Sequence, residues 1–519
     1  MEKQFTQEQL DIINISTKMQ RNESLKIQAC AGSGKTSTLL EIAKANPNQN
    51  FLYLAFNKSI VEEAKKKFPQ NVIVKTIHSL AYSRIINSNG YKITNKHTFD
   101  DYQGILGINN YNDFILFNQI LNEFLNSSNK HFQYQMIADL FDAARQGKIP
   151  YTHSMYLKEF QLLKPEARGL DEFDFILLDE AQDTNALTLD IFVENQCKKI
   201  LVGDTFQNIY GFRETINALE EIKTTYEKNL TYSFRCNQSI LNRACYFLKE
   251  YGGKNVFFHS AYKENQEEKK TSAIITRTNA SIIELIANIM ENSNSTQKYK
   301  LIKEPESIFA TSLNCYYLKN GYPEKMDKEY KWLSRLNAEE LEEYIEKDLE
   351  ISNAFKIVKK YGSKIFEIFE EAKNLFKAKE YDCCITNAHI SKGLEWSNVK
   401  LYEDFPSLRE LERELEELKH KAKGELLANK KLELTKKLRE ETNLYYVALK
   451  RAKDYVVDKT HNDFEYKNFL ASLEEKTNSN IEEVKTCEEM ILLRKEYQES
   501  QKQEESEQEN DSSKKTHRQ

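Results

Sequence analysis

Residues 26–36 read KIQACAGSGKT, in which a short apolar segment leads into a glycine-rich turn and then into an apolar helix. Such a turn exposes backbone N–H groups that bind phosphate oxygens at the positive end of the helix. In this pattern Lys35 is expected to reach the β- and γ-phosphates of a nucleotide, and the Thr36 hydroxyl to hold Mg²⁺. The strict pattern has glycine where this chain has Ala29. The other residues expected to bind the nucleotide here are Ala31, Gly32, Ser33, Gly34 and Ser37.

A second polar cluster follows an apolar run farther along the chain, at residues 176–180 (ILLDE). Asp179, at the tip of the expected strand, is placed to hold Mg²⁺ through water, and Glu180 to orient or deprotonate the attacking water. Alone, an apolar strand that ends in two acids is a weak signal. Together with the glycine-rich turn, it predicts a nucleotide hydrolase.

The composition of the 519-residue chain is typical of a globular protein with several domains, since 40% of residues are hydrophobic and 30% are charged. The sequence contains no run of about 18 apolar residues of the kind that spans a membrane, and the polar start MEKQFTQEQL does not resemble a secretory signal. Eight cysteines are scattered without metal-ligand spacing, which favours reduced thiols in an intracellular protein. The net charge of −6 does not decide whether the chain binds nucleic acid.

Short apolar runs, each ending in a polar or glycine-rich turn, recur in two parts of the chain with helical segments between them. This alternation predicts an α/β fold with parallel sheets. The strands expected in the first part are residues 26–30, 51–56, 72–77, 173–178 and 199–202. The strands expected in the second part are residues 229–233, 272–276, 383–386, 399–403 and 454–457.

Helical segments interrupt this pattern at residues 84–165 and 281–380. Residues 408–441 are rich in Leu, Glu and Lys with heptad-like spacing, and we interpret them as a charged helical hairpin that turns near Gly424. A coiled coil that binds a partner protein is the alternative for this segment. The tail at residues 488–519 is rich in Glu, Gln and Ser and is predicted to be disordered.

The sequence DEAQD at residues 179–183 resembles motif II of superfamily 1A helicases, the UvrD/Rep/PcrA group. Segments similar to the other motifs of that group occur in the same order between residues 5 and 458. The resemblance implies two RecA-like P-loop domains with helical insertions. The implied bounds are 1–83 and 166–227 for domain 1A, 84–165 for a 1B-like insertion, 228–280 and 381–470 for domain 2A, and 281–380 for a reduced 2B-like insertion.

The resemblance assigns roles around the nucleotide. Gln9 in FTQEQLDII is expected to read the adenine edge, and Gln207 in VGDTFQNIYGFR to sense the γ-phosphate. In TYSFR, Phe234 is expected to stack on adenine and Arg235 to lie near the γ-phosphate. Motif III often carries an acidic pair, and this chain has residues 205–206 (TF) there instead.

Motifs V and VI complete the implied nucleotide site. In HISKGLEW, Gly393 is expected to contact the nucleotide and Glu395 the ribose. In NLYYVALKRAK, Arg451 resembles the second arginine finger. The chain has Asn387 in motif V and Lys450 in motif VI where the family usually has threonine. These departures bear on how ATP turnover is coupled to movement, and they remove no charge that hydrolysis needs.

Three further segments look like the helicase core of the F-box DNA helicase subgroup and its bacterial and phage relatives. They are THSMYLKEFQLLKP at residues 152–165, YEDFP at residues 402–406 and ETNLYYVALKRAK at residues 441–453. No F-box is expected, because the residues before Phe5 could not hold one.

The resemblance also implies a track for single-stranded DNA, on which aromatic side chains stack against bases. Phe56, Tyr210 and Phe212 stand where the family places such residues, with a core position as the alternative for Phe212. The remaining DNA-binding candidates are Asn57, His78, Arg213 and His389. For the two histidines, a buried structural role is the alternative.

The function implied is an ATP-dependent helicase that moves 3′ to 5′ on single-stranded DNA, with ATP and Mg²⁺ as cofactors. Single-stranded and tailed duplex DNA are the expected partners, with no membrane partner, and residues 408–441 or the acidic tail are candidate protein-binding segments. A translocase that strips proteins from single strands without unwinding, and an ATP-switched DNA-binding module, are the alternatives. The expected location is cytoplasmic and nucleoid-associated, or nuclear in a eukaryote, with roles in DNA repair or recombination.

Overall fold

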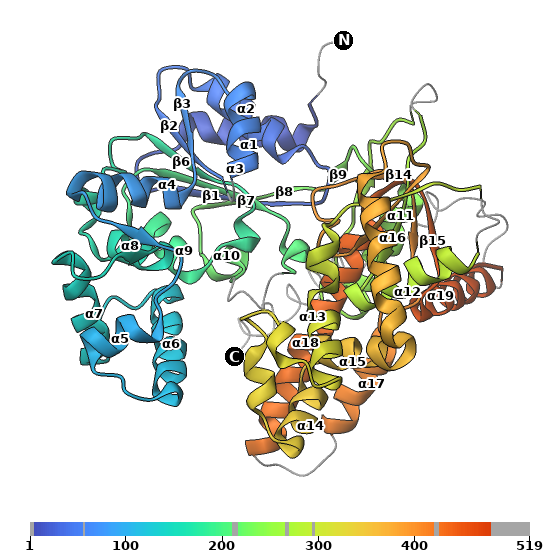
Figure 1. Cartoon of the computed structure of the whole chain (residues 1–519). Coiled ribbons are helices and arrows are strands. Elements are labelled where there is room, and N and C mark those ends of the chain that lie inside the picture. Colours follow the sequence, from blue (N-terminus) through green and yellow to red (C-terminus); the bar gives the residue numbers. More distant parts are fainter. Residues whose placement is uncertain are drawn as a thin grey trace, which may run out of the picture.

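The computed structural model describes residues 5–55, 58–209, 216–264, 269–292, 296–419 and 425–478. Over these residues the chain forms two lobes, each built on a parallel β-sheet, with helical insertions attached to both (Figure 1). The predicted α/β class with parallel sheets and helical insertions is therefore confirmed.

The first lobe contains a six-stranded sheet in the order β3-β2-β6-β7-β1-β8. All of its neighbouring strands pair in parallel. Its strands are β1 (Ser24–Ala29), β2 (Phe51–Leu54), β3 (Val72–Lys75), β6 (Phe175–Leu178), β7 (Lys198–Gly203) and β8 (Tyr226–Leu230). Because both faces are covered there, β2 (FLYL) and β6 (FILL) are apolar and buried throughout, whereas β1 (SLKIQA) alternates buried and half-buried residues.

The two faces of this sheet belong to two different cores. Phe51 and Tyr53 point into one core, and Leu52 and Leu54 into the other, as the two-residue period of a strand requires. Three helices contribute to the first core, and α9 (Ala186–Glu194) contributes to the second. The three helices are α1 (Gln7–Lys18), α2 (Lys35–Ala45) and α3 (Lys58–Lys67).

One expected strand of the second lobe lies elsewhere. The sequence pattern predicts residues 229–233 as a strand of the second part, but β8 pairs with β1 at the edge of the first sheet, with Leu25 opposite Tyr226. Only the short β9 (Tyr232–Ser233) continues beyond it, and β9 pairs with β10 (His259–Ser260). An apolar run ending in a turn does not reveal which of two sheets receives it, so the sequence pattern could not settle this point.

The second lobe contains a five-stranded parallel sheet in the order β12-β13-β11-β14-β15. Its strands are β11 (Ser272–Thr276), β12 (Tyr299–Leu301), β13 (Cys383–Asn387), β14 (Trp396–Leu401) and β15 (Ala452–Asp458). Strand β12 lies within residues 281–380, which were expected to be a helical insertion. Helix α12 (Asn279–Glu291), which precedes that strand, and helix α16 (Ile365–Lys377), which precedes β13, share a core with β12.

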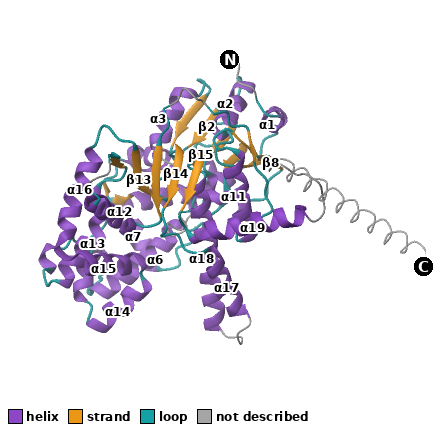
Figure 2. Ribbon diagram, turned by 90° about the vertical axis from the view of Figure 1, so that its right-hand side faces the viewer, coloured by secondary structure: helices purple, strands orange, loops and turns teal. Residues whose placement is uncertain are grey.

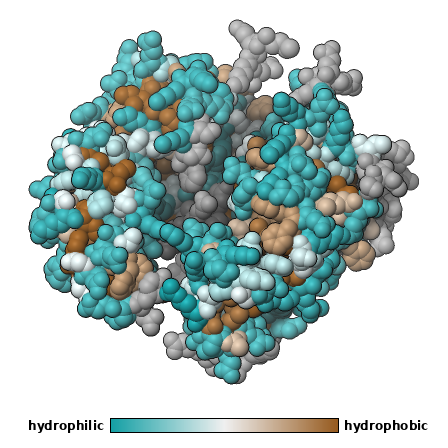
Figure 3. All heavy atoms as spheres, viewed as in Figure 1, coloured by the Kyte–Doolittle hydropathy of each residue, from teal (hydrophilic) through white to brown (hydrophobic). Residues whose placement is uncertain are grey.

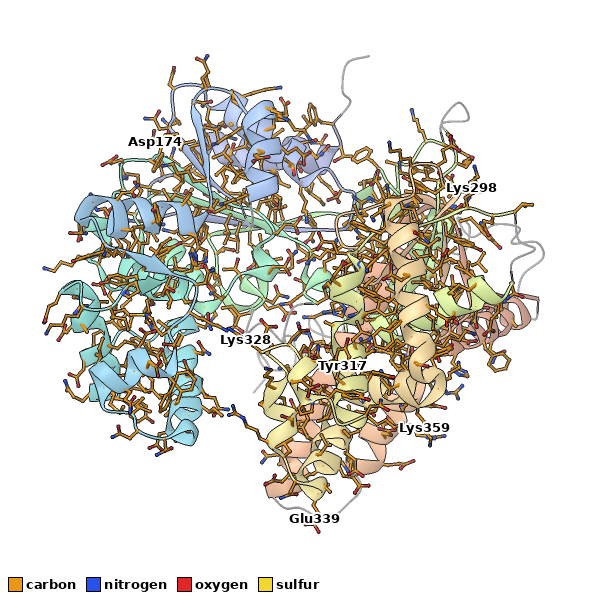
Figure 4. All side chains as sticks on the ribbon, viewed as in Figure 1. Asp174, Lys298, Tyr317, Lys328, Glu339 and Lys359 are labelled. Atoms are coloured by element: carbon orange, nitrogen blue, oxygen red, sulfur yellow. The ribbon has the colours of Figure 1, made fainter. Side chains whose placement is uncertain are left out.

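The helices between β12 and α16 form what we call the helical module, residues 305–361. It comprises α13 (Pro305–Lys319), α14 (Ala338–Lys347) and α15 (Leu349–Tyr361). Cys315, Met326, Leu333 and Ile351 help to form a small core of its own. Lys328, in the segment after α13, lies on the side of the module that faces the first lobe (Figure 4).

Residues 84–165, predicted to be helical, are mainly helical and also contain a short parallel pair of strands, β4 (Ile93–Thr94) and β5 (Tyr151–Thr152). This insertion in the first lobe contains α5 (Phe99–Leu106), α6 (Tyr111–Asn126), α7 (Gln135–Arg145) and α8 (His153–Leu162). The chain enters it through α4 (Ile77–Ala81), which continues as one stretch of π-helix over Tyr82–Asn87. In the space-filling view a hollow separates the two halves of the molecule, and the surfaces beside it are mainly hydrophilic (Figure 3).

Helices α17 (Leu408–Lys419) and α18 (Glu425–Leu449) pack along each other and project from the second lobe (Figure 2). The C-terminal part of α18 enters the core of that lobe, where Tyr445, Tyr446 and Leu449 are buried. The turn expected near Gly424 and the tail expected at residues 488–519 lie outside the described residues. Within the described part of the chain, no helix is both long enough and apolar enough to cross a membrane.

Candidate functional site

The glycine-rich turn lies between the end of β1 and the start of α2, as the sequence predicts. Gly32 and Gly34 have φ angles of +76° and +79°, a backbone region that favours glycine. A Cβ atom added to Gly32 would come within 2.5 Å of the Arg235 Cβ atom. Gly32 is therefore required both by its backbone conformation and by the close approach of the segment that carries Arg235.

Three of the predicted catalytic and metal-binding residues lie together beside this turn. The Lys35 Nζ atom is 2.8 Å from Glu180 Oε1. Asp179 accepts a hydrogen bond of 2.8 Å from the Glu180 backbone N–H and another from the Tyr53 hydroxyl. Thr36 is half-buried in the first turn of α2, one residue beyond Lys35.

The ionisation of the two acids follows from their surroundings. Burial raises the pKa of Glu180, but Lys35 and Lys392 outweigh it and hold that pKa at about 2. Burial and the neighbouring Glu180 raise the pKa of Asp179. Glu180 therefore carries a negative charge at neutral pH. It also has a φ of +51°, a left-handed conformation that costs a non-glycine residue about 1–2 kcal/mol and that is common at functional sites.

Gln182 connects motif II to motif III, a role that the sequence did not reveal. Its Nε2 atom donates to Glu180 Oε2 at 2.6 Å, and its Oε1 atom accepts from the Asp204 backbone N–H at 3.0 Å. The predicted γ-phosphate sensor Gln207 donates from Nε2 to Asp204 Oδ2 at 2.8 Å. Gln207 and Glu180 are thus linked through buried hydrogen bonds.

The segment around β9 rests on the glycine-rich turn. The Ser233 hydroxyl donates to the Ala31 carbonyl at 2.8 Å, and the Phe234 backbone N–H donates to the Gly32 carbonyl at 2.9 Å. Phe234 itself is 41% exposed, which leaves an aromatic ring at the surface beside Gly34.

Gln9 lies on the other side of Gly34. A Cβ atom placed on Gly34 would be 3.1 Å from Gln9 Nε2 and 3.9 Å from Phe234 Cε2. Gln9 Nε2 also donates to the Thr38 hydroxyl at 3.1 Å, and its Oε1 atom accepts from the Thr6 backbone N–H at 3.0 Å. The two residues expected to contact adenine are therefore brought together by the structure.

Arg235 is held by an acid that was expected to contact ribose. Its Nε atom donates to Glu395 Oε2 at 2.7 Å, and Lys453 Nζ lies 3.1 Å from Glu395 Oε1. Glu395 is thus neutralised by two cations, and its contact with ribose stays a prediction. Gly393, two residues earlier, has a φ of +88° in the loop that leads into β14.

Arg451 is buried, with 1% of its surface exposed. Its Nε atom donates to the Val447 carbonyl at 2.8 Å and its Nη1 atom to the Leu394 carbonyl at 3.2 Å. Its Nη2 atom has no hydrogen-bond partner among the described residues. Burial, followed by repulsion from Arg235, lowers the pKa of Arg451 to about 10. Two nearby guanidinium groups, one with an unused donor, form a site that an anion would stabilise.

Several polar contacts cross from the second lobe to motifs II and III, and the sequence did not reveal them. Lys392 Nζ donates to Asp183 Oδ2 at 2.5 Å and to the Gln207 carbonyl at 2.7 Å. From α18, Asn443 donates to the Asn208 carbonyl at 3.0 Å, and the Tyr446 hydroxyl donates to Asp204 Oδ2 at 2.8 Å. The sequence signal that could have indicated these contacts was a charged residue without an assigned partner in each of motifs II and V, namely Asp183 and Lys392.

The residues fit a nucleotide with Mg²⁺. The Ser33 hydroxyl in the turn is buried without a hydrogen-bond partner among the described residues, as is Arg451 Nη2. Such orphaned buried donors are costly unless a ligand satisfies them. The Thr36 hydroxyl and the Asp179 carboxylate supply oxygen atoms of the kind that Mg²⁺ prefers.

The predicted DNA-binding residues are only partly described. His78 is exposed on α4, with its ring edge-on to Tyr156 at a centroid distance of 5.9 Å. His389 follows β13 and is half-buried, and burial followed by repulsion from Arg277 lowers its pKa to about 4. The predicted DNA-binding residues outside the described part of the chain are Phe56, Asn57, Tyr210, Phe212 and Arg213.

The fold and the glycine-rich turn define a P-loop protein of the nucleotide-binding class. Residues 13–213 match the family model described as an AAA domain. The chain is 27% identical over 461 residues to F-box DNA helicase 1 of Gallus gallus, an alignment that covers 78% of this chain and 45% of the chicken protein.

The chain is also 27% identical over 533 residues to F-box DNA helicase protein 1 of Schizosaccharomyces pombe, covering 88% of this chain and 57% of the yeast protein. The chain thus spans about half the length of the curated relatives it matches. The resemblance to superfamily 1 helicases, and in particular to the F-box DNA helicase subgroup, is confirmed by these matches.

Proposed function

We propose that this chain is an ATP-driven DNA helicase that moves 3′ to 5′ along single-stranded DNA. The observation that carries the proposal is the contact of the segment at residues 232–235 with the phosphate-binding turn, through Ser233 and Phe234. A nucleotide in that turn would touch both lobes. The names of the two relatives support DNA as the substrate.

In this proposal the first lobe holds the triphosphate. Backbone N–H groups of residues 31–36 bind its oxygens, and Lys35 exchanges its ion pair with Glu180 for the β- and γ-phosphates. Mg²⁺ held by Thr36 and Asp179 would neutralise charge on the phosphates as the γ-phosphate leaves. Glu180, released from Lys35 and ionised, orients the attacking water.

The second lobe supplies the positive charge that completes the site. Arg235 leaves its pair with Glu395, and Arg451 uses its unpaired Nη2 donor, when the γ-phosphate draws the two lobes together. Arginine fingers of this kind contribute about 10³–10⁵-fold to the rate. Loss of the γ-phosphate removes the attraction, so the nucleotide shifts the lobes between two arrangements through differential contacts.

The cross-lobe hydrogen bonds suggest how this change is coupled to movement. Lys392 joins Asp183 to the Gln207 carbonyl, and Tyr446 joins Asp204 to the core of the second lobe. A change at the phosphates therefore reaches α18 and the loop of His389 through residues already in contact. Phe56 and Tyr210 are the proposed base-stacking residues on the track.

A second candidate function is a translocase that strips proteins from single strands without unwinding duplex DNA. It is favoured by the small size of the helical module, residues 305–361, once β12, α12 and α16 are counted with the second sheet. Less protein is then available to contact a duplex ahead of the motor.

The test is an ATPase assay with and without single-stranded DNA, followed by unwinding of 3′-tailed and 5′-tailed duplexes. The helicase proposal expects stimulation by DNA and unwinding only of the 3′-tailed duplex. Stimulated ATPase with removal of a bound protein filament but no unwinding would favour the second candidate. ATPase that does not respond to DNA would contradict both, and the Lys35→Ala variant controls for contaminating activity.

A further inference from the structure

Lys450 is a fully buried lysine where the two lobes meet, and the proposed hydrolysis scheme gives it no role. It follows the last residue of α18 and directly precedes Arg451, and none of its surface is exposed. Within the described ranges of the chain, it forms no ion pair with any acid. Burial of a charged group is costly unless partners compensate it. The partners of Lys450 therefore indicate what it does.

Two aromatic rings and one hydroxyl contact the Lys450 ammonium group. Its Nζ atom lies 4.5 Å from the centroid of the Phe258 ring and 5.2 Å from that of the Tyr446 ring. The same atom donates to the Tyr446 hydroxyl at 3.3 Å. Ring faces attract a cation, but they compensate only part of the cost of removing it from water. The hydroxyl is the contact that leads onward to an acid.

Tyr446 links Lys450 to Asp204 of the first lobe, because its hydroxyl donates to Asp204 Oδ2 at 2.8 Å. A tyrosine hydroxyl has a single proton, a lysine ammonium group can only donate, and a carboxylate can only accept. When Lys450 donates to the hydroxyl oxygen, the hydroxyl proton is directed to Asp204. All three side chains are fully buried, so water does not compete for these hydrogen bonds.

The same carboxylate oxygen holds the predicted γ-phosphate sensor. Gln207 Nε2 donates to Asp204 Oδ2 at 2.8 Å, so Gln207 and Tyr446 share one acceptor atom. Lys450 also acts on the phosphate-binding turn, since burial raises the pKa of Cys30 to about 12 and the charge of Lys450 opposes that rise. A chain of hydrogen bonds from the second lobe thus ends on the atom that holds Gln207 in the first.

We propose that Lys450 is a positioning residue for ATP hydrolysis, which directs the Tyr446 hydroxyl to Asp204 and thereby fixes the orientation of Gln207. This inference rests on the proposed function, because it concerns hydrolysis at the same site. It gives a role to a lysine that stands where the related helicase motif usually has threonine. Threonine has no ammonium group to donate to the hydroxyl, so the lysine adds a contact across the lobe junction.

The test is steady-state ATP hydrolysis by Lys450→Met in the full-length chain, with and without oligothymidylate. Methionine has a similar length and no donor, so the Tyr446 hydroxyl is no longer directed to Asp204. We expect kcat to fall about 10-fold, the rate equivalent of one hydrogen bond from a charged donor. The KM for ATP should be unchanged, because Lys450 acts through other residues rather than on the nucleotide.

The melting temperature distinguishes positioning from a structural role. Asp204 keeps its hydrogen bonds from Gln207 Nε2 and the Phe206 backbone N–H in Lys450→Met, so the melting temperature should change little. A lysine that only stabilised the fold would give the opposite pattern, with a lower melting temperature and a normal kcat for the folded molecules. That pattern would overturn the inference.

A double-mutant cycle tests whether Lys450 acts through Tyr446. Tyr446→Phe removes the hydroxyl and should itself lower kcat. The double variant should be no slower than Tyr446→Phe alone, since Lys450 then has no hydroxyl to direct. A further loss as large as that in the wild-type background would overturn the inference. If Lys450→Met does not fold, Lys450→Thr, with the residue usual in the related motif, makes the same comparisons.

The matched control is Lys158→Met in the helical insertion of the first lobe. Lys158 is also fully buried, and its Nζ atom lies 4.2 Å from the centroid of the Phe124 ring. It donates to the backbone carbonyls of Ser127 and Asn129 rather than to a hydroxyl at the lobe junction. Its removal should lower the melting temperature and leave kcat unchanged. An equal loss of kcat in both lysine variants would overturn the inference.

The two arms of the ATPase assay separate this inference from the proposed function. If oligothymidylate does not stimulate the wild-type chain, the proposed function fails, and hydrolysis without DNA still measures the effect of Lys450→Met. If oligothymidylate stimulates hydrolysis and Lys450→Met has the wild-type kcat, the inference alone fails.

Discussion

Lys392 of the second lobe forms an ion pair with Asp183 of the first lobe, with Nζ 2.5 Å from Oδ2. The Asp183 side chain is 2% exposed and the Lys392 side chain 12%, so little water screens the pair. Lys392 also donates to the Gln207 carbonyl. The pair therefore joins motif V to motifs II and III at the point where the lobes meet.

Breaking the ion pair between Lys392 and Asp183 should uncouple the binding of ATP from the binding of DNA. In Lys392→Ala we expect the factor by which a non-hydrolysable ATP analogue changes DNA affinity to fall toward one. A coupling of about 1–3 kcal/mol corresponds to a factor of about 5–150 in the wild type. Lys379→Ala, an exposed lysine near the start of β13, is the control. A coupling factor that is the same in Lys392→Ala and wild type would contradict this role.

The same pair predicts a pH dependence. Burial raises the pKa of Asp183 from 3.8 to about 6, with Lys392 opposing the rise. Below about pH 6 the carboxyl is protonated and the ion pair is lost, so we expect the coupling factor to fall as the pH drops through that value. Asp183→Asn should show the reduced factor at neutral pH and a flat profile. A wild-type profile that is equally flat would exclude Asp183 as the titrating group.

The direction in which the free energy of unfolding changes with pH distinguishes the loss of coupling from unfolding of the chain. Because the pKa of Asp183 is higher in the folded chain than its ordinary value of 3.8, the folded state binds the proton more tightly. The contribution of this group to the free energy of unfolding therefore falls as the pH rises from about 4 to about 6. Loss of coupling in mild acid would thus occur without destabilisation by Asp183, which thermal unfolding at each pH can check.

Variants of Glu180 and Lys35 should separate the binding of ATP from its hydrolysis. Glu180→Gln keeps the shape of the side chain but removes the charge that orients water, so ATP binding should persist while hydrolysis falls about 10²–10⁴-fold. Lys35→Ala should abolish hydrolysis and weaken ATP binding. Single-turnover hydrolysis and binding of a fluorescent ATP analogue measure the two effects. Normal turnover in either variant would contradict the assignment of the phosphate site.

The motifs around the phosphate-binding turn could be predicted because each carries its chemistry in consecutive residues. GSGKT specifies a turn, a lysine and a hydroxyl in a single segment, and the structure brings Lys35 beside Glu180 as expected. The parallel sheets follow from apolar runs such as β2 and β6, which are buried on both faces.

What the sequence could not predict are contacts between residues far apart in the chain. Gln182 binds Asp204 and Lys392 binds Asp183 only because the chain returns to the same place, and no local pattern records that return. Strand β8 is a similar case, since its edge position beside β1 depends on which sheet offers a free edge. The Glu395 pair with Arg235 was missed for the same reason.

Arg451 should be required for turnover and not for nucleotide binding. Its Nη2 atom lacks a partner among the described residues, and its removal takes away a cation that the γ-phosphate would engage. We expect Arg451→Ala to lower the rate of hydrolysis about 10³–10⁵-fold with ATP binding retained. Because Arg451 is buried, the turnover of Arg451→Lys and the melting temperature of each variant should be measured as well, to separate loss of turnover from loss of folding. Arg413→Ala, an exposed arginine on α17, is the control.

Phe234 should contribute to ATP affinity through its ring alone. It is 41% exposed beside Gly34 and Gln9, so its removal leaves no cavity in the core, and folding should be unaffected. Loss of base stacking is expected to cost about 1–3 kcal/mol of affinity, which raises the Kd for ATP in Phe234→Ala with little change in the rate at saturating ATP. Tyr232→Ala removes a ring of similar exposure, 38%, that packs on His259 instead. Titration with a fluorescent ATP analogue should weaken in the first variant and not in the second, and equal affinities in both would mean that the adenine lies elsewhere.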